Sequence, residues 1–191
     1  MAETTVMLVG ADSWYPPSRR ILNLLKQVDG FTFYGGYLNH WSSQQWAVIK
    51  YSGLTPLPIW VPDWSRDPIA QANRAMRRAR IAGMTGAVAL DTTIGLAQLD
   101  KPVNWIEDWS LRLAKQKWYS IEHSHYRHSS STFLWLVKWG EHDELPKSGE
   151  AIQHGPYILF DNSGKRVANL VSDVADESFP FANWIERPRP I

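Results

Sequence analysis

The chain has 191 residues, a formal net charge of +1, 44% hydrophobic and 20% charged residues, and no cysteine. These values fit one globular domain with a real core, and they exclude a disulfide framework, a thiolate metal site and the basic field typical of nucleic-acid binding. The N-terminus lacks a basic segment before its short apolar run, and no apolar run is long enough to cross a bilayer, so we expect neither a signal peptide nor a membrane span.

Short apolar strands alternate with amphipathic helices over the first two thirds of the chain. Ser42 and Gln45 form an S-x-x-Q capping box at the start of one helix, and Asp67 with Pro68 gives another helix its N-cap and first turn. Glycines follow several of these helices and favour their termination there. The predicted strands are residues 4–10, 31–38, 54–61, 87–90 and 118–121, and the predicted helices are residues 18–30, 42–52, 67–82 and 104 to about 116.

Two of the predicted helices have a clear apolar face. In the helix of residues 67–82 the apolar side chains recur at helical spacing and we expect them to be buried, with four arginines on or beside the solvated face. In the next helix Asn104 and Glu107 resemble a capping pair. The buried faces are predicted to consist of Ile69, Ala72, Met76 and Ala79 and of Trp105, Trp109 and Leu113, and the arginines are Arg74, Arg77, Arg78 and Arg80.

The last third of the chain has little helical periodicity. Residues 132–139, 151–157 or 151–160, and 167–174 predict strands joined by loops that contain Gly, Pro and Ser. We therefore predict a single-domain α/β fold, an incomplete or irregular (β/α) TIM-like barrel with β/α units first and mostly β strands with loops at the C-terminal end. The domain is predicted to span residues 1–186, and residues 187–191 are predicted to form an extended tail.

Carboxylates follow three of the predicted strands. Asp12 follows the first strand, Asp63 follows the third, and Asp91 ends the apolar run in TGAVALDTT. In parallel α/β folds the reactive groups lie at the carboxyl ends of the strands. We therefore expect these three side chains to converge on one rim of the barrel.

Aromatic residues are unusually frequent, with 11 Trp, 7 Tyr and 6 Phe. Several of the tryptophans fall at predicted strand ends and loops, including Trp14, Trp60 and Trp64. Flat aromatic faces beside carboxylates suit sugar rings, whose axial hydrogens pack on the ring while their hydroxyls bond to the acids. For a single Trp, packing in the core or rim is the simpler interpretation. For the group as a whole, we expect a subset that faces a sugar.

The order of these motifs resembles a known family. GADSWYP, YLNHWSSQQWAVIKYSGLTPLPIWVP, AGMTGAVALDTT, FLWLVKWG, AIQHG and VSDVADESF are similar to the ordered landmarks of family 25 glycoside hydrolase lysozymes. They are equally similar to the related glycoside-hydrolase-like domains of actinobacterial and phage proteins. The resemblance covers nearly the whole chain. It implies a barrel of β/α units followed by strands with few helices, and an activity that cleaves the glycan of peptidoglycan between its amino sugars.

The resemblance also assigns roles to individual residues. It implies that Asp12 is the acidic residue after the first strand and that Asp91 is the first carboxylate of the family's Asp-x-Glu. Trp135 and Gln153 lie on strands that carry a Trp and a Trp-Gln pair in the family, and Asp173 or Asp176 matches its late acidic position. Thr93 stands where the family has its catalytic Glu. A hydroxyl cannot protonate a glycosidic oxygen, so this departure puts hydrolysis in doubt.

Glycoside hydrolysis generally needs two carboxyl groups. The available replacements for the missing Glu are Asp12 paired with Asp91, Glu122 at the end of the fifth strand, and Asp63. If Asp91 were held neutral by crowding against Asp12, it could donate the proton. The predicted catalytic residues are Asp12, Asp91 and Glu122, and the predicted substrate-binding residues are Trp14, Tyr37, Trp60, Asp63, Trp64, Thr93, Trp135, Gln153, Asp173 and Asp176.

Three histidines in IEHSHYRHSS raise the question of a metal. His123 and His125 would point to one side of a strand, and a carboxylate nearby could complete a site. Polar rim residues are the simpler interpretation of His123, His125 and His128, because no H-E-x-x-H spacing is present. Neither a G-x-S-x-G elbow nor a phosphate-binding glycine loop occurs. We expect no metal and no cofactor.

Three functions fit these observations. The first is a catalytically impaired glycoside-hydrolase-like domain that binds bacterial cell-wall glycan, as a phage virion or tail component. The second is an active peptidoglycan muramidase with a rearranged acid pair. The third is a structural protein whose aromatic surface meets other virion subunits. The expected partners are cell-wall glycan and virion subunits, not nucleic acid or membrane. We expect synthesis in the cytoplasm, then association with a virion or release to the wall by a route other than a signal peptide.

Overall fold

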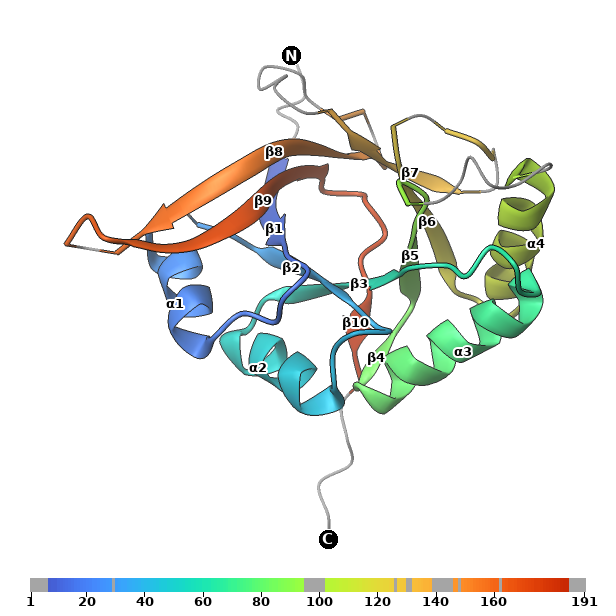
Figure 1. The fold of residues 1–191 in the computed structure, drawn as a ribbon, viewed down its shortest axis with the longest axis horizontal. Coiled ribbons are helices and arrows are strands. Elements are labelled where there is room, and N and C mark those ends of the chain that lie inside the picture. The colour runs from blue at the N-terminus through green and yellow to red at the C-terminus, as the bar shows by residue number, and fades with distance from the viewer. Residues whose placement is uncertain are drawn as a thin grey trace, which may run out of the picture.

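Eight strands close into a barrel (Figure 1). The computed structural model describes residues 7–28, 30–94, 102–125, 127–129, 132–138, 146–147, 149–161 and 163–185. The predicted tail, residues 187–191, lies outside the described residues. The elements are β1 (Met7–Asp12), α1 (Arg19–Val28), β2 (Phe33–Tyr37), α2 (Ser43–Ser52), β3 (Thr55–Trp60), α3 (Pro68–Ile81), β4 (Met84–Thr85), β5 (Ala87–Asp91), α4 (Pro102–Lys115), β6 (Tyr119–Ser124), β7 (Phe133–Val137), β8 (Ala151–Phe160), β9 (Arg166–Asp176) and β10 (Asn183–Trp184).

The barrel is parallel over most of its circumference. Strands β1, β2, β3, β5, β6, β7 and β8 pair in that order as parallel neighbours, and β9 closes the barrel by pairing antiparallel with both β8 and β1. Helices α1 to α4 cover the outside of the first part, and the long β8–β9 ribbon extends past α1 (Figure 1). The predicted irregular TIM-like barrel is therefore confirmed. Its irregularity lies in the antiparallel closing strand and in the lack of helices after α4 within the described part of the chain.

Local sequence signals set the helix boundaries. Ser42 and Gln45 make both bonds of the predicted capping box at α2, and Gly53 ends that helix with a φ of 74°. At α3 the Asp67 side chain accepts a hydrogen bond from the backbone N–H of Ala70 at 2.6 Å. The predicted cap at Asn104 is wrong, because α4 already begins at Pro102.

The buried face of α3 differs from the predicted stripe at its start. Ile69 is 45% exposed, whereas Gln71 is buried with Ala72, Met76 and Ala79. The reason is that Gln71 makes several hydrogen bonds to the turn after β3, which places its side chain on the inward face. An amide with its partners supplied by the fold can be buried at little cost.

Strand β3 accommodates two prolines inside the barrel. The backbone N–H of Thr55 donates to Thr32 on the β2 side, and because donors alternate along a strand, positions 56 and 58 face β5. Pairing between β3 and β5 begins only at Ile59. Pro56 and Pro58 therefore lie where no donor is required.

A small second sheet lies beside the N-terminal end of β3. Strand β10 pairs antiparallel with β4, and the Trp184 Nε1–H donates to the Leu54 carbonyl at 3.1 Å. These two-residue strands carry no hydrophobic period, so the sequence did not predict them. None of the described helices is long and apolar enough to span a membrane.

Candidate active site

Polar side chains fill the barrel interior near the carboxyl ends of the strands. Asp12 on β1, Asp91 on β5, His123 on β6 and Asp173 on β9 are all at most 4% exposed. Neighbouring strands place them together, because Asp91 lies in register with His123, and Asp173 lies beside Gly10, two residues before Asp12. Side chains at alternate positions of a barrel strand point inward, so this register builds one buried polar cluster.

The cluster is held by hydrogen bonds from two further strands. The Gln153 side chain on β8 donates to Asp12 Oδ2 at 2.7 Å, and the Trp135 indole N–H on β7 donates to Asp173 Oδ1 at 3.0 Å. Strand β2 leaves room for this arrangement at Gly35, where a Cβ atom would lie 2.8 Å from the Asp12 Cβ. Glycine is therefore required at this position by the close approach of β1 and β2.

Burial raises the pKa of two of the aspartates. The pKa of Asp12 rises to about 6, because burial and the nearby charge of Asp91 outweigh the opposing effects of His123 and Gln153. The pKa of Asp173 lies well above its ordinary value, first because of burial and then because of the charge of Asp12. The charge of Asp12 disfavours ionisation of Asp173, whereas a hydrogen bond with Asp173 lowers the pKa of Asp12, so at least one proton remains on the pair at mildly acidic pH.

The pKa of Asp91 is shifted in the opposite direction. Burial opposes its ionisation, but its pKa still lies below the ordinary value because His123 and Thr93 stabilise the anion. His123 Nδ1 lies 3.6 Å from Asp91 Oδ1, and the Thr93 hydroxyl and backbone N–H donate to the same oxygen at 2.5 and 3.0 Å. Burial alone would lower the pKa of His123, yet Asp91 raises it. The hypothesis that Asp91 is held neutral by crowding is therefore wrong, and the carboxyl groups with raised pKa values are Asp12 and Asp173.

A groove of about 510 Å³ leads from the surface to Asp12. One wall is the segment after β1, with Trp14 and Tyr15 exposed by 40% and 79%, and the other wall is the stretch 167–171 of β9. Tyr37 is a buried residue of the lining, and its ring centroid is 4.6 Å from that of Trp14. Burial, followed by the charges of Asp12 and Asp91, raises the pKa of Tyr37, so its hydroxyl stays a hydrogen-bond donor.

The aromatic wall of the groove is fixed by the residues behind it. The Ser13 hydroxyl donates to the Tyr15 carbonyl at 2.5 Å and lies 2.8 Å from the Tyr34 hydroxyl. The Trp41 indole N–H donates to the Trp14 carbonyl at 2.9 Å. These bonds hold the backbone of the segment after β1, and the Trp14 ring packs on the rings of Tyr37 and His40, so this part of the groove is arranged before any ligand binds.

Comparison with known proteins shows which solved structures share this fold. No protein-family model and no curated protein matches the sequence. A family 25 glycosyl hydrolase from Bacillus anthracis superposes with a TM-score of 0.62 at 10% identity, over 91% of this chain and 90% of that one. An uncharacterized protein of B. stearothermophilus also gives 0.62, at 13% identity over 89% and 96%. The chain has a glycoside-hydrolase-like fold. The glycoside hydrolase domain of PelA from Pseudomonas aeruginosa aligns more weakly, with a TM-score of 0.42 at 14% identity over 83% and 71%.

In this glycoside-hydrolase-like barrel, Glu122 does not join the other acids. It neighbours His123 on β6 and therefore points to the opposite face of the strand. Its carboxylate is fully buried and accepts hydrogen bonds from the backbone N–H of His128 at 3.1 Å and from the Thr132 hydroxyl at 3.1 Å, with a further short contact to the His128 ring. Glu122 thus fixes the segment after β6, and it is not available to a ligand in the groove.

Several other predicted site residues also lie outside the buried cluster. Asp63 is on the outer side of the barrel in an ion pair with Arg66, and Trp60 donates its indole N–H to Gln71 on α3. Trp64 donates to the Ile94 carbonyl. Asp176 pairs in register with Met7, at the opposite end of β1 from Asp12, and accepts bonds from Gly149 and Ser178. These residues do not converge with Asp12, Asp91 and Asp173. The structure does bring Trp14, Tyr37, Thr93, Trp135, Gln153 and Asp173 to the cluster or its groove.

Sequence reasoning missed His123 as a partner of Asp91. The alternation of β6 allows either Glu122 or His123 to face inward, and both are buried, so only the barrel register with Asp91 identifies His123. His125 lies beyond the end of β6, near the Val137 carbonyl, so it does not join His123. Among the described residues, no group of three or more His, Asp or Glu side chains is arranged to hold a metal ion.

Proposed function

We propose that the chain binds bacterial cell-wall glycan in the groove beside Asp12 and hydrolyses it poorly or not at all. The observation that carries this proposal is the composition of the groove. Exposed Trp14 and Tyr15 and inner Tyr37 offer flat faces for sugar rings, and Asp12 offers a hydrogen-bonding partner for hydroxyls. The glycoside-hydrolase-like fold and the sequence resemblance to family 25 lysozymes support a wall glycan as the ligand.

The same groove supports impaired catalysis. Hydrolysis of a glycosidic bond generally needs two carboxyl groups beside the bond. Of the residues that line the groove, Asp12 is acidic, whereas Asp91 is 1% exposed and bonded to Thr93. The resemblance places Thr93 at the position of the family's proton donor, and a threonine hydroxyl does not donate a proton at physiological pH.

Binding to purified peptidoglycan tests the proposal. The wild type is expected to sediment with insoluble sacculi, and Trp14→Ala and Tyr15→Ala are each expected to weaken retention by about tenfold, since each removes a stacking face. Tyr51→Ala is the matched control, because Tyr51 is 77% exposed near the end of α2, away from the groove. Equal retention of all three variants, or no retention of the wild type, would contradict binding in the groove.

One observation favours a second candidate, an active muramidase. The pKa of Asp12 is raised to about 6, whereas that of Asp91 is lowered, and two carboxyl groups with separated pKa values are typical of an acid paired with a charge stabiliser. Such an enzyme would lose activity as the pH rises above about 6, because Asp12 would lose its proton. Lysis of cell walls with that pH profile, abolished in Asp12→Asn, would establish this candidate.

The association with a phage virion stays a prediction from the sequence resemblance. It extends the proposal, because a tail component that binds wall glycan would hold a particle at the cell surface. A protein that meets other virion subunits through its aromatic surface would instead bury Trp14 and Tyr15. In that case the isolated chain would not be retained on sacculi, so the sedimentation experiment also separates these two functions.

A further inference from the structure

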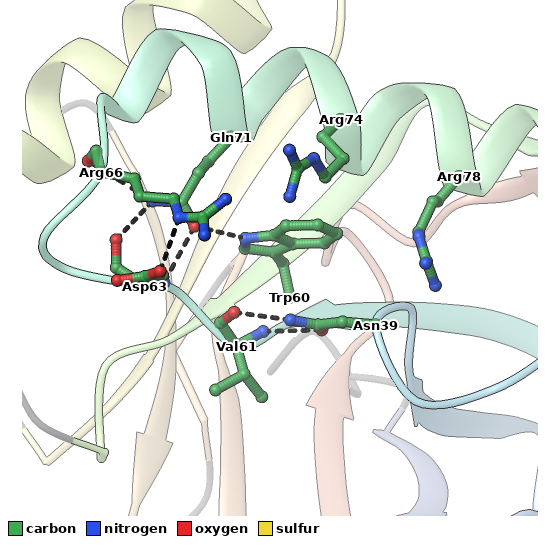
Figure 2. Close-up of a pocket in the computed structure, with 8 residues that line it drawn as sticks. All are labelled: Asn39, Trp60, Val61, Asp63, Arg66, Gln71, Arg74 and Arg78. Carbon is green, nitrogen blue, oxygen red and sulfur yellow. Dashed lines mark hydrogen bonds and ion pairs between the residues drawn. The ribbon is translucent and has the colours of Figure 1, made fainter.

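A second pocket lies outside the barrel, between β3, the turn after β2 and α3 (Figure 2). Its volume is about 230 Å³. Three arginines line it, Arg66, Arg74 and Arg78, against one acidic residue, Asp63. Figure 2 shows Arg74 and Arg78 extending from one side of α3, with Arg74 above the Trp60 ring.

The uncharged polar groups of the pocket are already used by the fold. Gln71 Oε1 accepts from the Asp63 backbone N–H at 2.9 Å and from the Trp60 indole at 3.3 Å, and its Nε2 donates to the Asp63 carbonyl at 2.6 Å. The Asn39 amide bonds to both the carbonyl and the N–H of Val61, at 2.7 and 3.1 Å. These bonds make the wall rigid, and the groups left to bind a ligand are the guanidinium groups.

Two of the positive charges in the pocket have no counter-charge there. Asp63 Oδ2 pairs with Arg66 Nε at 2.8 Å, and its other oxygen accepts bonds from Ser65. Arg78 donates to the Leu38 carbonyl at 2.9 Å, which orients its side chain but leaves its charge unneutralised. Arg74 has neither an ion pair nor a hydrogen bond within the described part of the chain. Arg74 and Arg78 are exposed and one helical turn apart on α3, so their side chains lie on the same face of the helix and an anion between them would contact two like charges.

We propose that this pocket binds a phosphate group, with Arg74 and Arg78 as its ligands. A phosphate monoester carries a charge of about −1.5 to −2 near pH 7, which matches the two uncompensated guanidinium groups. The planar donors of arginine fit phosphate oxygens with two parallel hydrogen bonds. The pocket is larger than one phosphate group, so it leaves space for part of a molecule that carries the phosphate. The site is separate from the groove beside Asp12 and does not depend on glycan binding.

Titration calorimetry in chloride buffer tests the proposal with four probes: inorganic phosphate, glucose 6-phosphate, glucose and acetate. We expect saturable one-to-one binding of phosphate and no binding of glucose. Tighter binding of glucose 6-phosphate than of inorganic phosphate would identify a carried phosphate as the ligand, and the reverse would identify the free ion. Arg74→Gln is the decisive variant, because Arg74 makes no contact that the fold needs, and it should weaken phosphate binding by about tenfold or more.

Arg77→Gln is the matched control, since it removes the same charge from α3 but the Arg77 side chain lines a different pocket. It should leave phosphate affinity within about twofold of the wild type. Equal weakening by Arg77→Gln and Arg74→Gln would overturn the site, because it would indicate a diffuse positive field. Absence of phosphate binding, or acetate binding as tight as phosphate, would also overturn it.

Discussion

Asp12 is a single residue that belongs both to the groove and to the buried cluster. It faces a groove where a ligand would contact it, and it is packed against Asp173 in the buried cluster. Burial raises its pKa to about 6 from the ordinary 3.8, so folding favours its protonated form. Its contribution to stability is therefore fully present below the unfolded pKa and is lost as the pH rises through about 6.

We predict that Asp12→Asn stabilises the fold at neutral pH and has little effect near pH 4. The ionised side chain costs on the order of 3 kcal/mol at neutral pH, and the amide removes this charge and also relieves Asp173. Urea denaturation at the two pH values measures the difference. Asp108→Asn, at an exposed position of α4, should show no such pH dependence. An Asp12→Asn variant less stable than the wild type at neutral pH would contradict the assignment.

Some helices and strands could be predicted from their own sequence, and others could not. The caps of α2 and α3 depend on neighbouring residues alone, so Ser42 and Asp67 marked both helices correctly. The inward face of β6 depends on the phase of a strand, which the pair Glu122 and His123 does not reveal by itself. Strands β4 and β10 depend on a contact between distant segments, and two residues are too few to show a period. Asp12 and Asp91 were found because strand ends are local features, whereas Asp173 was suggested, with Asp176 as the alternative, by the family resemblance. The way these acids meet comes from barrel register.

A substitution at Gly35 on β2 would test the close packing around Asp12. A Cβ at Gly35 would lie 2.8 Å from Asp12 Cβ, 3.3 Å from Ile59 Cδ1 and 3.4 Å from Trp135 Cη2. We predict that Gly35→Ala lowers the free energy of unfolding by about 1–3 kcal/mol, because the overpacked strands must move apart. Glycan retention per folded molecule should fall as well, since Asp12 is displaced. Urea denaturation and sedimentation with sacculi measure the two effects, and a variant as stable as the wild type would contradict the close approach.

Two late segments of the chain complete the molecule, the β8–β9 ribbon within the barrel and β10 in the small second sheet. The β8–β9 ribbon completes the barrel and is joined to α1 by an ion pair between Arg20 and Asp161 at 2.7 Å. The same ribbon forms one wall of the groove, so the closing strands of the fold also shape the candidate binding surface. Strand β10 then secures the other end, where the Trp184 ring also lies 5.7 Å from Lys50 Nζ.

We predict that Trp184→Ala lowers the free energy of unfolding by roughly 1–3 kcal/mol, because a half-buried indole and its bond to Leu54 are lost. Trp184→Phe should lie between the variant and the wild type, since it restores packing without the donor. Urea denaturation followed by circular dichroism should still show a single transition, as expected for one cooperative domain. An unchanged unfolding midpoint in Trp184→Ala would show that β10 does not support the barrel.

The most direct test of impaired catalysis is to measure the release of soluble fragments from purified peptidoglycan. The wild type and Thr93→Glu are compared side by side. Thr93 is exposed and bonded to Asp91, so a glutamate there could supply the missing carboxyl group beside Asp91. The account predicts that the wild type binds the material but releases almost none, whereas Thr93→Glu releases fragments at a measurable rate. Full activity of the wild type would contradict it.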